Sequence, residues 1–131
     1  MFDALHLDLE PQSLDVWASG TATDKRALLD NLLDAYVDIR AALDAGGYPA
    51  LPIYADIPFT WDKIPGSIDW ASTADRDAWF NDISAVLDGL TIMTFSKDSF
   101  PELETATEYE RGPFGTGPGT VHVAIQPKVG S

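Results

Sequence analysis

The amino-acid sequence predicts an α/β fold: a partial (β/α)8 TIM barrel of four parallel strands with three intervening helices. The first segment alternates strictly between apolar and polar residues, and three more short apolar segments follow it. In the longer segments between them, apolar residues recur at three- and four-residue spacing, as on one face of a helix. Alternating strands and helices imply parallel strands with the helices packed outside them. Four strands cannot close an eight-stranded barrel, so we expect part of one.

The first strand is expected over residues 5–10, because only a strand has a side-chain period of two. Its apolar face consists of Leu5, Leu7 and Leu9, which we expect to pack against helices. Its opposite face consists of His6, Asp8 and Glu10, which we expect to point toward the barrel axis or its carboxyl-terminal mouth. Pro11 ends the strand.

The remaining elements follow in alternation, each bounded by a capping residue, a glycine or a proline. Further strands are expected over residues 51–59, 90–95 and 120–126. Helices are expected over residues 23–45, from a cap at 72 or 73 to about 88, and over 101–111. Thr21 or Thr23 can cap the first helix, and Gly46-Gly47 ends it. The loop 60–71 and the Gly/Pro-rich loop 112–119 carry no helical pattern.

The composition is that of one folded domain, residues 1–131, with a strongly acidic surface. The chain is 45% apolar and has 8 Lys and Arg against 21 Asp and Glu, a formal charge of -13. Such a charge repels nucleic acid and anionic membranes, which makes both poor partners. The absence of cysteine excludes disulfides and thiolate metal sites. Because the chain opens almost directly into a strand, we expect that an upstream part of the barrel is missing.

The polar face of the first strand is the strongest functional signal. Burying three ionisable groups on one face is costly unless they pair or take part in chemistry. Glu10 comes last in this strand, where barrel active sites are built, and we expect it to act as a general acid. Asp8, two residues earlier, would help to keep Glu10 protonated. The alternative is an internal network of ion pairs and hydrogen bonds without catalysis.

Residues 3–10, Asp-Ala-Leu-His-Leu-Asp-Leu-Glu, resemble the D-x-x-D-x-D-x-E motif of family 18 glycoside hydrolases, the chitinase-like barrels. That motif lies on the fourth barrel strand, and residues 51–58, 92–95 and 120–127 are similar to the fifth, sixth and seventh strands. The resemblance implies that Glu10 protonates the glycosidic oxygen and that Asp8 orients the acetamido group of the substrate. His6 stands where the family has an Asp, and Phe95 stands where it has a Tyr.

The expected function is therefore that of a fragment or truncated member of a glycoside-hydrolase-like barrel that acts on or binds carbohydrate, with no cofactor. The candidate substrate-binding residues are His6, Asp56, Asp62, Trp17, Trp61, Trp70 and Gln126. The tryptophans follow strand ends, where flat rings can stack on sugars, or else they cap the core under long loops.

Two alternatives remain open. In the first alternative to a glycosidase, the chain is a non-catalytic carbohydrate-binding or orphan barrel. In the second, it is a metal-dependent hydrolase in which two of His6, Asp8 and Glu10 combine with Asp56 and His122 to hold the metal. We also expect self-association through the open sheet edges.

Overall fold

The computed structural model describes residues 3–94, 99–111 and 120–124, and it confirms an α/β fold with a parallel sheet. The strands are β1 (Leu5–Leu7), β2 (Ile53–Pro58), β3 (Gly89–Met93) and β4 (Thr120–Ala124). The helices are the short 3₁₀ helix η1 (Pro11–Ser13), α1 (Asp15–Ser19), α2 (Ala22–Ala45), α3 (Thr73–Val86) and α4 (Phe100–Ala106). Neighbouring strands are parallel throughout and lie in the order β1-β2-β3-β4.

The first strand is shorter than its alternating sequence predicts. Backbone pairing joins β1 to β2 only from Leu5, opposite Ile53, to Leu7, opposite Ala55. Pro11 has no backbone N–H to donate, and it opens η1 with Glu10 in the N-cap position. The expectation that Asp8 and Glu10 belong to the strand is therefore wrong. The helix α1 is a further difference, because the first helix expected from the sequence begins only at residue 23.

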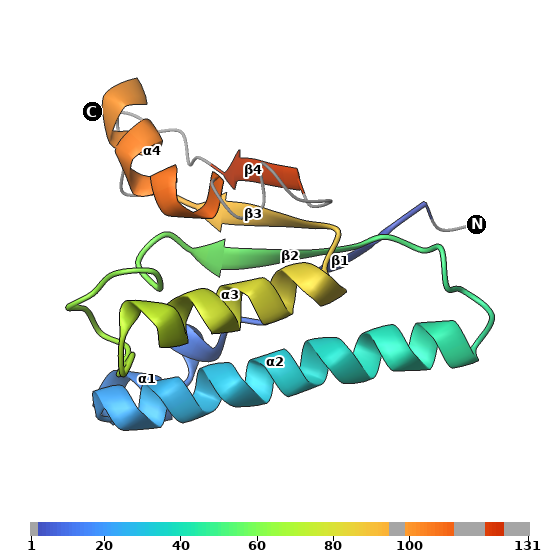
Figure 1. The fold of residues 1–131 in the computed structure, drawn as a ribbon, viewed down its shortest axis with the longest axis horizontal. Coiled ribbons are helices and arrows are strands. Elements are labelled where there is room, and N and C mark those ends of the chain that lie inside the picture. The colour runs from blue at the N-terminus through green and yellow to red at the C-terminus, as the bar shows by residue number, and fades with distance from the viewer. Residues whose placement is uncertain (1–2, 95–98, 112–119, 125–131) are drawn as a thin grey trace.

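Helices cover one face of the sheet. Ile53, Ala55 and Ile57 alternate along β2 and are fully buried on this face, together with Leu90 and Ile92 of β3. Figure 1 shows α2 and α3 side by side along it. As the leucine pattern predicts, Leu7 packs against the same core, whereas Leu9, beyond the end of β1, is 38% exposed and the expectation that it packs against helices is wrong.

The opposite face, which we call the open face, is more polar and more exposed. It is formed by the alternate residues of the four strands, whose cross-strand partners place them together. Its members are His6, Tyr54, Asp56, Thr91, Met93 and His122. None of them is fully buried.

The two longer helices begin at the caps that the sequence predicts. Thr21 and Asp24 form a reciprocal capping box at the start of α2, and the Ser72 side chain accepts a hydrogen bond from the Asp75 N–H at the start of α3. Each cap satisfies backbone donors that a helix start leaves unpaired. Within the described part of the chain, none of the helices combines the length and apolar character needed to cross a membrane.

Candidate functional site

The open face carries one short polar contact between adjacent strands. His6 Nε2 lies 2.6 Å from Asp56 Oδ1, with the His6 side chain 53% exposed and that of Asp56 16% exposed. The two residues come from β1 and β2 and are diagonal neighbours, since His6 stands opposite Tyr54. The His122 and Tyr54 rings meet edge to face farther along this surface, with centroids 6.3 Å apart. The structure thus brings together two of the predicted site residues, His6 and Asp56.

Asp8 and Glu10 lie just beyond the carboxyl end of β1, and both are exposed. The Glu10 carboxylate accepts a hydrogen bond from Gln12 Nε2 at 3.3 Å, and its backbone carbonyl accepts two more from Ser13. Glu10 is therefore held at a turn that leaves its carboxylate open to solvent at the end of the strand. A strand face shared by His6, Asp8 and Glu10 does not form.

Of the three tryptophans expected to bind substrate, two are buried and one is partly buried. Trp61 and Trp70 are 1% and 7% exposed and belong to the core, so the expectation that their rings are open to a ligand is wrong. The Trp70 indole N–H donates to the Trp61 carbonyl at 2.8 Å, and both rings contact Trp79. Trp17, in α1, is only partly buried and packs at a 6.0 Å centroid distance from Trp61. Trp17 is thus the least buried of the three, with Lys25 Nζ 5.8 Å from its ring centroid.

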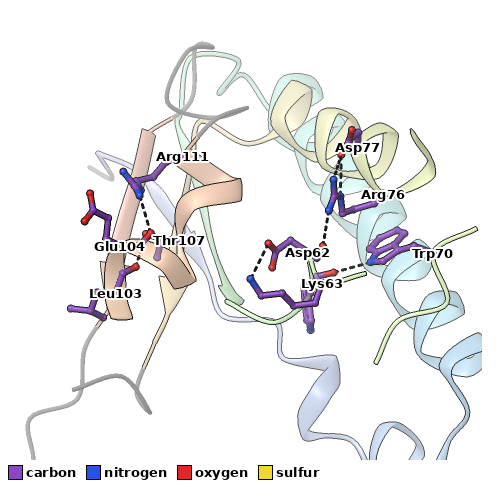
Figure 2. Close-up of polar contacts among 10 residues, drawn as sticks. Asp62, Lys63, Trp70, Arg76, Asp77, Leu103, Glu104, Thr107 and Arg111 are labelled. Carbon is purple, nitrogen blue, oxygen red and sulfur yellow. Dashed lines mark hydrogen bonds and ion pairs between the residues drawn. The ribbon is translucent and has the colours of Figure 1, made fainter. Parts of the chain in front are cut away.

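Asp62 is buried beyond the carboxyl end of β2, apart from the His6–Asp56 contact. Its Oδ2 lies 3.5 Å from the Lys63 ammonium group, and Arg76 donates to its backbone carbonyl at 2.9 Å. Figure 2 shows these side chains converging from the loop after β2 and from α3, with α4 nearby. The other carboxylate oxygen, Oδ1, has no hydrogen-bond partner among the described residues. Burial raises the pKa of Asp62, an effect that Lys63 opposes.

Arg76 is held in place by its neighbours. Its guanidinium lies 3.0 Å from Asp77 and 4.2 Å from the centre of the Tyr109 ring, and the Tyr109 hydroxyl donates to Asp77 at 2.6 Å. The hydrogen bond from Tyr109 lowers the pKa of Asp77. The Arg76 guanidinium thus already has Asp77 and Tyr109 as partners.

Glu110 is the most unusual ionisable group in the described part of the chain. It lies in the helical turn 108–111 and is fully buried, and neither carboxyl oxygen has a hydrogen-bond partner among the described residues. Burial and the nearby Asp62 charge raise the pKa of Glu110 to about 8. Glu110 therefore carries a proton in the folded chain at neutral pH. The local sequence contains no signal for this, because Glu108 and Glu110 flank Tyr109 alike and only Glu110 is buried.

Two hollows adjoin this buried region at the carboxyl end of the sheet. The larger, of about 430 Å³, is lined by Asp62, Lys63, Arg76, Thr105 and Tyr109, among others. The second, of about 380 Å³, shares Lys63 and Thr105 with it.

Gln126 and Phe95 lie outside the described residues. Among the residues that are described, no three His, Asp or Glu side chains are arranged to hold a metal ion, so the geometry adds no support to the metal-dependent alternative.

Comparison of the chain with protein-family models, with curated proteins and with solved structures finds no match.

Proposed function

We propose that this chain is part of a glycosidase-like (β/α) barrel that acts on or binds carbohydrate at the carboxyl end of its parallel sheet. The observation that carries the proposal is the one-sided sheet, with helices on one face and polar side chains on the other. An all-parallel sheet normally has both faces covered, either by helices on both sides or by closure into a barrel.

Strand order distinguishes these two arrangements. A doubly wound sheet places helices on both faces because its strand order reverses at a switch point. Right-handed crossovers that always advance in one direction place every helix on the same face, as in a barrel. The order β1-β2-β3-β4 contains no reversal, which favours the barrel.

The open face supplies groups that suit a neutral hydroxyl-rich ligand. The His6–Asp56 pair presents an acceptor and a ring nitrogen at the surface, and Tyr54 and His122 add aromatic rings. Glu10 stands at the carboxyl end of β1, where barrels carry their reactive groups, and we assign it the general-acid role, with Asp8 assisting. Trp17, which is partly buried against Trp61 and has Lys25 Nζ 5.8 Å from its ring centroid, is the indole that we assign to contact with a sugar ring.

A titration of the full chain with a panel of neutral oligosaccharides, followed by backbone amide NMR, tests this proposal. We expect resonances of Tyr54, Thr91 and His122 to shift. Asp56→Asn should weaken binding roughly 10- to 150-fold, because a hydrogen bond to a carboxylate that orients His6 contributes about 1.5–3 kcal/mol. Asp38→Asn is the matched control, since Asp38 is an exposed carboxylate on α2. If no glycan shifts these resonances, or if both variants bind equally well, the assignment of the open face is wrong.

The barrel proposal also predicts the behaviour of the chain in solution. Of the described strands, β1 and β4 form the sheet edges, where unpaired backbone groups invite pairing with another chain. We expect concentration-dependent self-association in light scattering, opposed but not prevented by the charge of -13. A stable monomer that unfolds cooperatively would contradict the proposal that the chain is part of a barrel.

A further inference from the structure

The two edge strands of the described sheet carry none of the residues that usually protect an exposed edge. The edges are β1, with the sequence Leu-His-Leu, and β4, with the sequence Thr-Val-His-Val-Ala. Neither contains a lysine, a carboxylate, a proline or a glycine. Native sheets keep their edges apart with charged side chains, prolines or bulges, and an edge strand that lacks them pairs readily with another strand. Both edges of this sheet are therefore suited to pairing with further strands.

The open face carries little charge, although the chain as a whole is strongly acidic. Asp56 is the single carboxylate among its members, and its Oδ1 lies 2.6 Å from the His6 ring nitrogen. In contrast, Asp30, Asp34 and Asp38 are exposed on α2, which covers the other face of the sheet. The formal charge of -13 thus opposes contact between two helix surfaces much more than contact between two open faces.

Two copies of this sheet supply the eight strands of a TIM barrel. The four described strands are parallel, and a two-fold rotation about the barrel axis leaves their direction unchanged. The rotation brings β4 of each copy beside β1 of the other, in parallel, at two identical seams. Closure of this kind leaves no unpaired edge, and a closed two-fold dimer is the commonest form of homo-oligomer.

We propose that two copies of this chain form one closed eight-stranded barrel, in which β1 of each copy pairs with β4 of the other and the two open faces line a shared interior. This assembly rests on the proposed function and deepens it by naming the partner that completes the site. Glu10 and Asp8 lie just beyond the carboxyl end of β1, so the seam with β4 of the second copy runs beside them. The carbohydrate site is therefore incomplete in a single copy.

Sedimentation of the full chain over a series of concentrations tests the assembly. We expect a species of twice the 14.2 kDa mass of the chain and nothing larger, because closure leaves no edge for further growth. His122→Glu adds a carboxylate to each open face, where closure buries it, and should raise the dissociation constant of the dimer at least about a hundredfold. The His122 side chain is exposed in the single copy, so the variant should still fold. Asn31→Glu is the matched control, since it adds the same charge at an exposed position on α2.

A spin label on one copy identifies the strands that meet at the seam. The chain contains no cysteine, so a single introduced cysteine carries a nitroxide at a known place. Leu9→Cys puts the nitroxide just beyond β1, at a side chain that is 38% exposed. When labelled chains are mixed with isotope-labelled chains that lack the nitroxide, broadening of amide resonances reports contacts between copies alone. We expect the strongest broadening in β4.

The outcomes separate the assembly from the proposed function. Assemblies larger than two copies, strongest broadening in β1, or an unchanged dissociation constant for His122→Glu would overturn the closed dimer. A chain that stays monomeric at every concentration would overturn it as well. In each of these cases the oligosaccharide titration decides independently whether the open face binds carbohydrate. A closed dimer in which no glycan shifts an open-face resonance would uphold the assembly while the carbohydrate function fails.

Discussion

Replacing Glu10 by glutamine is expected to lower glycan hydrolysis by about 10²–10⁴-fold, the usual contribution of a general acid. Glutamine keeps the shape of the side chain and its contact with Gln12 but has no proton to give to the glycosidic oxygen. Glu10 is exposed and adopts the N-cap position of η1 without a side-chain capping bond, so the substitution should leave the fold intact. Oligosaccharide affinity should change little.

The measurement is the release of reducing ends from oligosaccharides under single-turnover conditions, with thermal unfolding as the check on folding. Glu104→Gln is the control, because Glu104 is an exposed glutamate on α4. Equal turnover by the Glu10→Gln variant and the unmodified chain would remove Glu10 from the mechanism. Binding without any turnover by the unmodified chain would favour the non-catalytic carbohydrate-binding alternative.

The second large effect concerns stability and belongs to Glu110. The unfolded chain ionises Glu110 near its ordinary pKa of 4.5, whereas burial raises the pKa in the folded chain to about 8. Between these values the folded state holds one more proton than the unfolded state. The free energy of unfolding therefore falls as the pH rises through this window, by up to about 5 kcal/mol.

Glu110→Gln isolates this contribution, because glutamine resembles the protonated carboxyl and does not titrate. We expect the variant and the unmodified chain to be about equally stable at pH 4.5, and the variant to be the more stable near pH 8. Urea unfolding at a series of pH values measures the difference. The groups that act on the Glu110 charge besides burial are Asp62, which raises its pKa, and Lys63 and Arg76, which lower it.

Glu104→Gln again serves as the control, since that carboxylate lies exposed on the surface of α4. A Glu110→Gln variant that tracks the unmodified chain across the whole range would show that Glu110 is ionised in the folded protein. The lowered pKa values of Asp24 and Asp77 affect stability only in more acidic solution and are common to both proteins.

Local sequence signals determined the order and type of the main elements. The helical spacing of the apolar residues, with Thr21 before them and Gly46 after them, is enough to place α2. The leucine alternation is enough to place Leu7 on the core side of β1 and His6 on the other. These features depend on neighbours within a few residues, which the sequence displays directly.

The tertiary structure alone decided how long β1 is and which polar groups meet. A strand extends only as far as its partner pairs with it, so Asp8 and Glu10 leave the sheet although they continue its pattern. Asp56 meets His6, fifty residues away, while Asp62 turns toward Lys63 and Arg76. Burial depends on what packs around a residue, which is why Trp61, Trp70 and Glu110 lie inside although their local sequence resembles that of a surface loop or turn.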